Sequence, residues 1–217
     1  MSPLAPNRFV MRPMEMDDIG TVAGWLQDVD DLSLFDRSLT VPPGKDAVRE
    51  SWKADLETAK FPTAYWFMIE SANRTPVAIG GLQSINYVHG DATLPILVSK
   101  SVRGQGLGLR IAIIMLDMAF DRLRLRRVTT FFRSDNLRTE RLTQRAGFRE
   151  EGRLREAWLI GGEFRDCVVV GLLRDEWYSR RSTLGAELSG SVEVVLGPPA
   201  QTTPAVGGSV PSKRALR

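Results

Sequence analysis

The sequence predicts an α+β fold with a mostly antiparallel sheet, on three observations. Apolar runs of strand length follow one another with connections of only a few residues, and connections that short join antiparallel strands. Residues 107–124 then change to the spacing of a buried helix. Two further apolar runs flank Gly161-Gly162, a typical hairpin turn. The strands predicted in this way are 64–70, 77–87, 92–98, 154–160 and 164–173.

The remaining elements follow from helix caps and periodicity. Asp17 or Asp18 can cap a first helix, whose apolar residues are Ile19, Val22, Ala23 and Leu26. A second helix is predicted over 45–60. Segment 28–44 between them is expected to be a loop, either a flap over a site or an ordinary connection. After the long helix, a short strand and a short helix are predicted, at 128–132 and at 139–146.

The composition is that of a globular domain followed by a tail. Hydrophobic residues make up 43% of the 217 residues, which is enough for one sizeable core. Residues 1–180 are predicted to form that domain. Residues 181–217 are expected to be a mobile tail, because 185–217 are rich in Gly, Pro, Ser, Thr and Ala. Within it, only 192–196 is apolar enough to dock on the domain.

Several classes of protein are excluded by what the chain lacks. The single cysteine, Cys167, stands in an apolar run and is predicted to be a buried strand residue. With only one histidine, His89, a metal site of several histidines is impossible, and no metal is expected. No run approaches the about 18 apolar residues of a membrane helix, and no secretion signal is evident. These features predict a cytoplasmic protein.

Arginines gather in the middle of the chain. The net charge is only +3, yet residues 122–127 read Arg-Leu-Arg-Leu-Arg-Arg. Five more arginines follow, at 133, 138, 141, 145 and 149. Such a run is most often a solvated face. The alternative is a surface that accepts a polyanion, either nucleic acid or a phosphorylated cofactor.

The most informative segment is Arg103-Gly104-Gln105-Gly106-Leu107-Gly108, between a predicted strand and the long helix. The first turn of a helix presents unpaired N–H groups and favours an anion. Glycines let a phosphate approach those groups closely. A tight strand-to-helix turn would explain the glycines equally well. The spacing does not match a nucleotide phosphate loop or a dinucleotide-binding turn.

The segment resembles the pyrophosphate loop of the GCN5-related N-acetyltransferase (GNAT) superfamily, whose signature is Gln/Arg-x-x-Gly-x-Gly/Ala. Arg103, Gly106 and Gly108 match it. Downstream, Asn136, Leu142 and residues 146–148 resemble the family's second conserved block. The resemblance covers residues 8–177 and implies a central mixed, mostly antiparallel twisted sheet with helices on both faces. It is strongest to the branch of ribosomal-protein N-terminal acetyltransferases, through Arg12-Pro13, Trp25-Leu26 and the segment 161–166.

By this resemblance, acetyl-CoA is the co-substrate, and one strand and one loop bind it. The strand would pair its backbone with the pantetheine arm, and one of its N–H groups would polarise the thioester carbonyl. Pro95 suits the point where this strand splays from its neighbour, or is simply an edge-strand proline. The predicted cofactor-binding residues are Ile96, Leu97, Val98, Arg103, Gly104, Gln105, Gly106, Leu107, Gly108 and Asn136.

Proton transfer is less well defined by the resemblance. Many relatives carry a tyrosine acid where this chain has Thr143, and often a glutamate where it has Thr93. Thr143 and His89 are the predicted catalytic residues, His89 because its pKa suits a general base. Other candidates for the base are Glu70, Asp91 and Glu156, or an ordered water.

The leading hypothesis is therefore an N-acetyltransferase that moves an acetyl group from acetyl-CoA to a primary amine by direct attack. The acceptor can be a protein N-terminus or a small molecule such as a polyamine, an amino sugar or an aminoglycoside-like compound. The alternative is a catalytically weak acyl-CoA-binding sensor or interaction module. A nucleic-acid binder would explain the charge but not the paired motifs. We expect no membrane or nucleic-acid partner, and a monomer or homodimer.

Overall fold

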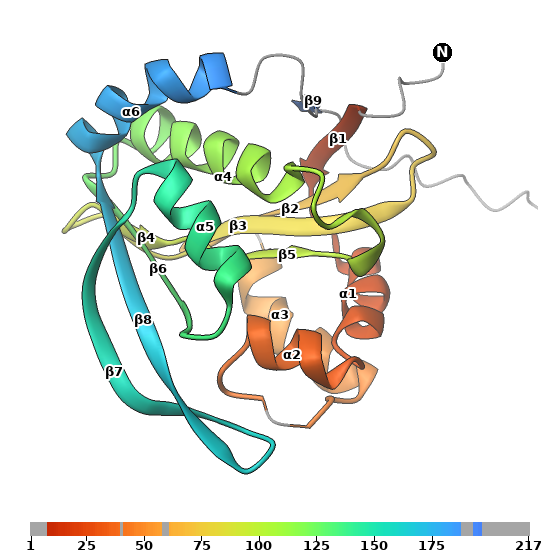
Figure 1. Ribbon diagram of the computed structural model, residues 1–217. Coiled ribbons are helices and arrows are strands. Elements are labelled where there is room, and N and C mark those ends of the chain that lie inside the picture. The colour runs from red at the N-terminus through yellow and green to blue at the C-terminus, as the bar shows by residue number, and fades with distance from the viewer. Residues whose placement is uncertain (1–7, 40, 58–60, 188–192, 197–217) are drawn as a thin grey trace, which may run out of the picture.

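The computed structural model describes residues 8–39, 41–57, 61–187 and 193–196, and it confirms the α+β fold (Figure 1). Nine strands within these residues form one mixed sheet, in the order β7-β8-β6-β4-β3-β2-β1-β9, and β5 pairs with β3 beside β4. Only the β4–β6 and β1–β9 pairs are parallel. The strands are β1 Arg8–Pro13, β2 Tyr65–Glu70, β3 Pro76–Asn86, β4 Asp91–Thr93, β5 Ile96–Val98, β6 Arg127–Arg133, β7 Arg149–Ile160, β8 Glu163–Leu173 and β9 Glu193–Leu196.

Helices cover both faces of the sheet. Figure 1 shows α4 and α6 on one side and α1, α2 and α3 on the other. The helices are α1 Ile19–Trp25, α2 Val29–Phe35, α3 Lys45–Leu56, α4 Leu107–Asp117, α5 Leu137–Ala146 and α6 Arg174–Glu187. Two 3₁₀ turns, η1 Met16–Asp18 and η2 Lys100–Val102, and a π-helical turn, η3 Met118–Arg122, complete the chain. No helix in the described parts of the chain has the length and apolarity to cross a membrane.

Side chains of β2 point alternately into two separate hydrophobic cores. Trp66 and Met68 are buried with α1 and α3, whereas Ile69 is buried against α4 on the opposite face. This is the period-two pattern of a strand covered on both sides. The predicted burial of Cys167 in a strand is confirmed in β8. Two apolar cores on one sheet make the sheet a rigid platform for the segments at its centre.

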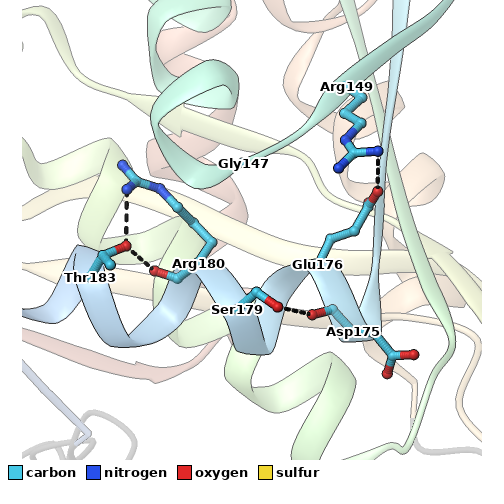
Figure 2. A pocket seen from close by; sticks show the side chains of 7 residues that line it. All are labelled: Gly147, Arg149, Asp175, Glu176, Ser179, Arg180 and Thr183. Carbon is cyan, nitrogen blue, oxygen red and sulfur yellow. Dashed lines mark hydrogen bonds and ion pairs between the residues drawn. The ribbon is translucent and has the colours of Figure 1, made fainter.

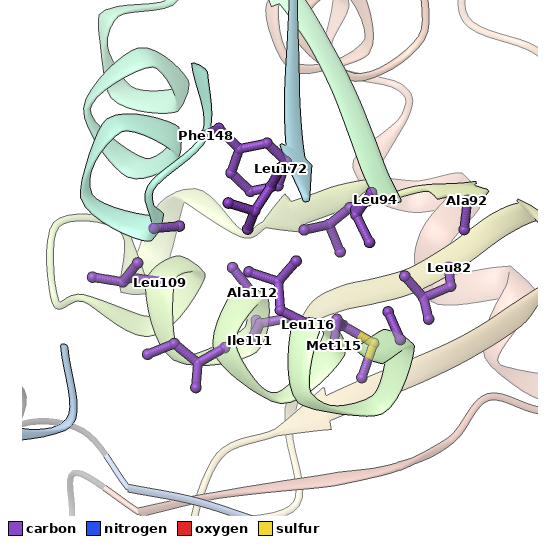
Figure 3. Packing of buried hydrophobic residues seen from close by; sticks show 14 of the residues in the cluster. Leu82, Ala92, Leu94, Leu109, Ile111, Ala112, Met115, Leu116, Phe148 and Leu172 are labelled. Carbon is purple, nitrogen blue, oxygen red and sulfur yellow. The ribbon is translucent and has the colours of Figure 1, made fainter. Parts of the chain in front are cut away.

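Helix α4 packs very closely on the sheet because β3 carries a glycine there. A Cβ added to Gly80 would lie 2.4 Å from Cγ2 of Ile111. Around this contact, Figure 3 shows Ile111, Ala112, Met115 and Leu116 of α4 in one apolar cluster with Leu82 and Leu172 from the strands and with Leu94, which follows β4. Gly80 therefore sets how near the N-terminal half of α4 comes to β5.

The predicted strand 92–98 is wrong in one respect, because the chain forms two strands there. β4 pairs with β3 and β6, whereas β5 pairs with β3 alone. The break falls at Leu94 and Pro95. The Leu94 N–H donates to Thr129 O, and its carbonyl accepts from Thr130 Oγ1 at 3.0 Å. Pro95 has no N–H to donate, so the ladder toward β6 ends there.

Several boundaries also differ from the sequence prediction. The segment 28–44 is not all loop, because α2 lies within it and begins where the Asp28 side chain accepts from the Asp31 N–H. Helix α3 ends at Leu56, and residues 58–60 lie outside the described residues. Helix α6 runs across residue 180, and β9 docks beside β1 as expected for 192–196. The mobile tail stays a prediction, because 188–192 and 197–217 lie outside the described residues.

Asp18 occupies the N-cap position of α1, one of the two predicted, but its side chain makes no capping hydrogen bond to that helix. Its carboxylate accepts two hydrogen bonds from Arg12, at 2.7 and 2.8 Å, and another from the Glu15 N–H. Arg12 also donates to Glu70 at 2.8 Å, and all three charged side chains are buried. The hydrogen bonds that Arg12 donates to Asp18 and then to Glu70 hold the pKa of its guanidinium above the ordinary value. The network joins the start of α1 to β1 and β2.

The packing of α4 on Gly80 predicts a specific loss of stability. We expect Gly80→Ala to lower the free energy of unfolding by about 1–3 kcal/mol, because the new methyl group overlaps Ile111. Gly152→Ala, in β7, is the matched control, since a Cβ there meets nothing within 4 Å. Urea titrations of both variants measure the difference. Equal midpoints for the two variants would contradict the close approach of α4 to β3.

Candidate active site

A cavity of about 500 Å³ opens where β5 diverges from β6 and pairs with β3 alone. Its walls come from α2, β3, β4, β5, the turn before α4, α4 itself, β6 and α5. The residues that line it are Asp31, Leu34, Phe35, Gln83, Thr93–Val98, Val102–Gly104, Gly106–Leu109, Thr130–Phe132, Asn136, Arg138, Thr139, Arg141–Thr143, Arg145 and Phe148. Segments more than 100 residues apart in the chain therefore share one cavity.

Strand β5 presents a free edge to this cavity. Pro95 O accepts from Gly81, and the Ser99 N–H donates to Val77, so the odd-numbered residues bond to β3. Because successive residues of a strand point their backbone groups to opposite sides, the groups of Ile96 and Val98 face away from β3. The Val98 carbonyl, accordingly, accepts from Arg103 Nε at 2.8 Å. The N–H groups of Ile96 and Val98 are the donors that β5 can offer to an extended ligand.

The turn between β5 and α4 is built for an anion. Gly104 and Gly106 have φ angles of 81° and 83°, a region that side chains other than glycine rarely adopt. A Cβ on either would meet nothing within 4 Å, so the turn leaves its outer surface open. Gly106 caps α4, whose first N–H groups have no partner within the helix. These groups and the helix dipole favour a phosphate at this end.

Arg103 links the turn to two other elements. Its Nε donates to Val98 O of β5, and its Nη2 forms an ion pair with Asp31 Oδ2 of α2 at 2.8 Å. The sequence predicted Arg103 as a cofactor-binding residue. The structure adds a second role, because the same guanidinium holds α2 over the cavity.

Helix α5 forms the basic wall of the cavity. Arg138, Arg141 and Arg145 line it and are exposed, so they can meet phosphates. By contrast, Arg122, Arg124 and Arg126 are exposed but do not line the cavity. The arginine run of the sequence thus supplies both a solvated surface and the site. One member, Arg133, is buried and bonds to Ser33 and Asp135.

Asn136 and Thr143 both line the cavity and already have hydrogen-bond partners. Asn136 caps α5, and its Oδ1 accepts from the Thr139 N–H at 3.2 Å. The side-chain NH₂ group of Asn136 is a donor that the cap does not use. Thr143 is buried and donates from Oγ1 to Glu140 O at 2.9 Å. A hydroxyl that donates to a backbone carbonyl is poorly placed to protonate a thiolate.

Most of the predicted site residues come together at this cavity. Besides Thr143, the residues that line it are Ile96, Leu97, Val98, Arg103, Gly104, Gly106, Leu107, Gly108 and Asn136. Gln105 lies in the same turn with its side chain exposed and does not line the cavity. His89 lies exposed in the turn between β3 and β4, four residues before Thr93, and does not line the cavity.

The other candidates for the base lie elsewhere. Glu70 is buried with Arg12 and Arg74, and Asp91 begins β4 opposite Arg127. Glu156 is exposed on β7, where its N–H donates to Asp166. Sequence reasoning missed Asp31, the one carboxylate that lines the cavity among the described residues. Its only signal was the acidic character of segment 28–44.

A second hollow, of about 520 Å³, lies between α6 and the end of α5 (Figure 2). Two of its side-chain contacts join residues of its own lining. Arg149 pairs with Glu176 at 2.9 Å, and Arg180 donates to Thr183 at 3.1 Å. None of the residues of the glycine turn or of β5 reaches it. We therefore assign the chemistry to the cavity at β5, although the two volumes are nearly equal.

Comparison with known families identifies the fold and the turn together. A family model described as an acetyltransferase (GNAT) domain matches residues 8–149, which contain α1 to α5, β1 to β6, the glycine turn and the basic wall. The chain belongs to the GNAT acetyltransferase family. Within the described residues, no group of three or more His, Cys, Asp or Glu side chains is placed to hold a metal ion.

Curated GNAT relatives include enzymes of two kinds. The chain is 27% identical over 114 residues to spermidine N(1)-acetyltransferase of Vibrio cholerae, an alignment covering 52% of this chain and 66% of that protein. It is 27% identical to the Escherichia coli K12 enzyme of the same name, over 49% of this chain and 58% of that protein. The putative ribosomal N-acetyltransferase YdaF of Bacillus subtilis is 28% identical over 44% of this chain and 52% of its own length. The chain thus spans between half and two thirds of these relatives.

Solved structures support the same fold. Spermidine N-acetyltransferase from Vibrio cholerae in complex with CoA and spermine superposes with a TM-score of 0.70 at 22% identity, covering 78% of this chain and 98% of that one. GNAT acetyltransferases use acetyl-CoA as the acetyl donor, and the residues present fit it. The open glycine turn and the exposed arginines suit its phosphates, and the free edge of β5 suits an amide-containing arm.

The open glycine turn predicts that a side chain placed there lowers CoA affinity. A control glycine with the same φ separates this effect from backbone strain. We expect Gly106→Ala to weaken CoA binding at least about tenfold, because the methyl group occupies the open surface beside the first N–H groups of α4. Gly162→Ala in the β7–β8 turn is the matched control, since Gly162 has the same φ of 83° and does not line the cavity. Isothermal titration with CoA measures both. Equal affinities for the two variants would show that the turn does not bind the cofactor.

Proposed function

We propose that this chain is an acetyl-CoA-dependent N-acetyltransferase that acts on a small-molecule primary amine. The observation that carries the proposal is the meeting of two donor surfaces in one cavity. These are the free edge of β5 at Ile96 and Val98, and the first turn of α4 after Gly106. A small amine is favoured over a protein N-terminus because the spermidine N-acetyltransferases align over more of this chain than YdaF does.

In the proposed reaction, the protein orients and polarises rather than forming a covalent intermediate. Bound acetyl-CoA would supply the thioester whose carbonyl carbon the neutral amine attacks. A C–N bond forms as the C–S bond breaks, CoA leaves as the thiolate, and the proton lost from the nitrogen passes to water. The N–H groups of Ile96 and Val98 can donate to the carbonyl oxygen as negative charge develops on it. The basic wall and the turn hold the phosphates, which fixes the reacting end relative to β5. Positioning of this kind is the largest contribution that the described residues offer.

Thr143 is not needed as an acid in this scheme. Its hydroxyl is committed to Glu140 O. A thiol has an ordinary pKa of about 8.5, so a thiolate is a tolerable leaving group near neutral pH without a protein acid. The absence of a tyrosine at this position is therefore compatible with turnover.

Release of free thiol from acetyl-CoA in the presence of an amine panel tests the proposal. The panel holds linear polyamines, amino sugars, an aminoglycoside and a peptide with a free N-terminus. We expect turnover with at least one small amine and a product heavier by one acetyl group on a nitrogen. CoA binding with no thiol release across the panel would instead support a sensor or interaction module. Acetylation of the peptide alone would contradict a small-molecule acceptor.

A further inference from the structure

Asp31 is a buried carboxylate, one oxygen of which has no hydrogen-bond partner among the described residues. The residue lies in the first turn of α2, is 6% exposed, and lines the cavity. Its Oδ2 forms the ion pair with Arg103, whereas its Oδ1 is buried and has no hydrogen-bond partner among the described residues. An unsatisfied buried acceptor is costly, the more so when it is charged. A donor supplied by a ligand in the cavity would remove that cost.

The charges around the cavity are arranged unevenly. Four arginines line it, at positions 103, 138, 141 and 145, and Asp31 is the only acidic residue among the described ones that do. The arginines of α5 and the glycine turn form the part suited to phosphates. Asp31 reaches the cavity from α2, on an element that contributes otherwise only Leu34 and Phe35 to the lining. A positively charged group in the cavity therefore has one place where it meets an opposite charge.

The reacting amine is not the group that this carboxylate serves best. An opposite charge nearby stabilises the protonated form of an amine and raises its pKa. Attack on a thioester needs the neutral amine, so a carboxylate paired with the reacting nitrogen would oppose the reaction. A second ammonium on the same acceptor has no such conflict, because it stays protonated throughout.

We propose that Asp31 is the anchor for a second positive charge on a dicationic acceptor, whose other, neutral nitrogen is acetylated. This inference rests on the proposed function and names its acceptor class as linear diamines and polyamines. The anchor is coupled to the donor half, because Arg103 joins Asp31 to the carbonyl of Val98 on β5. Asp31 is a binding residue for the acceptor in this account and takes no proton from it.

Asp31→Asn is the test, with Asp30→Asn as the matched control. Asparagine keeps an oxygen for Arg103 but removes the charge. Asp30 is the neighbouring acid of the same helix, is exposed, and does not line the cavity. The acceptors compared are putrescine and aminobutanol, in which a hydroxyl replaces one ammonium. For each protein, kcat/KM for both acceptors and the Kd for CoA are measured.

We expect the wild type to prefer putrescine by about ten- to a hundredfold in kcat/KM, as a charge-assisted contact in a desolvated site would give. Asp31→Asn should reduce that preference to about threefold or less, through KM, and leave the Kd for CoA within about threefold. Asp30→Asn should keep the preference. The proposal is overturned by a preference that survives Asp31→Asn, by an equal loss in Asp30→Asn, or by a loss of CoA affinity as large as the loss of preference.

A second variant and a binding measurement cover two further cases. If Asp31→Asn does not fold, as judged by circular dichroism, Asp31→Glu retains the charge and should retain a preference for putrescine; its loss overturns the anchor. If the wild type releases no thiol with any amine, the proposed function fails on its own. Calorimetric binding of putrescine and aminobutanol to the CoA complex then decides the anchor, by the same comparison of variants.

Discussion

The site depends on a single interruption in the hydrogen-bonding ladder of the sheet. At Leu94 the chain still bonds to β6, through Thr129 and Thr130. At Pro95 it has no N–H to give, and β5 continues with β3 alone. The N–H groups of Ile96 and Val98 are thereby released from strand pairing at the centre of a sheet covered on both faces. Few places in a globular protein combine unpaired strand edge with so much surrounding structure, since buried polar groups are normally satisfied.

The neighbouring features gain their function from that edge. Gly80 lets α4 approach β3 closely, which places the first turn of α4 beside the end of β5. Arg103 then bonds to β5 on one side and to α2 on the other. The cavity therefore joins the cofactor turn to α2, which carries Asp31, the one acidic side chain of the lining among the residues that the structure describes. Donor and acceptor halves of the proposed reaction are connected by one guanidinium.

Features that depend on neighbouring residues in the chain could be predicted from the sequence, whereas features that depend on residues far apart in the chain could not. The glycine turn and the long helix after it were predicted, because each is encoded within a few consecutive residues. Helix α2 was not, since seven residues give no reliable periodicity. The Asp31–Arg103 ion pair joins residues 72 positions apart, so no local sequence pattern predicts it. The break between β4 and β5 was predicted only in part. Pro95 indicated a splay, whereas the apolar run indicated one continuous strand.

Amide hydrogen exchange with and without CoA tests the central claim most directly, because it reads the released backbone groups themselves. The account predicts that CoA slows exchange at Ile96 and Val98 of β5 and at Leu107 and Gly108 of α4. The amides of the exposed β3–β4 turn around His89 and of the α6 hollow should exchange at unchanged rates. Protection confined to the α6 hollow, or none at β5 under saturating CoA, would contradict the assignment of the cofactor to the interrupted sheet.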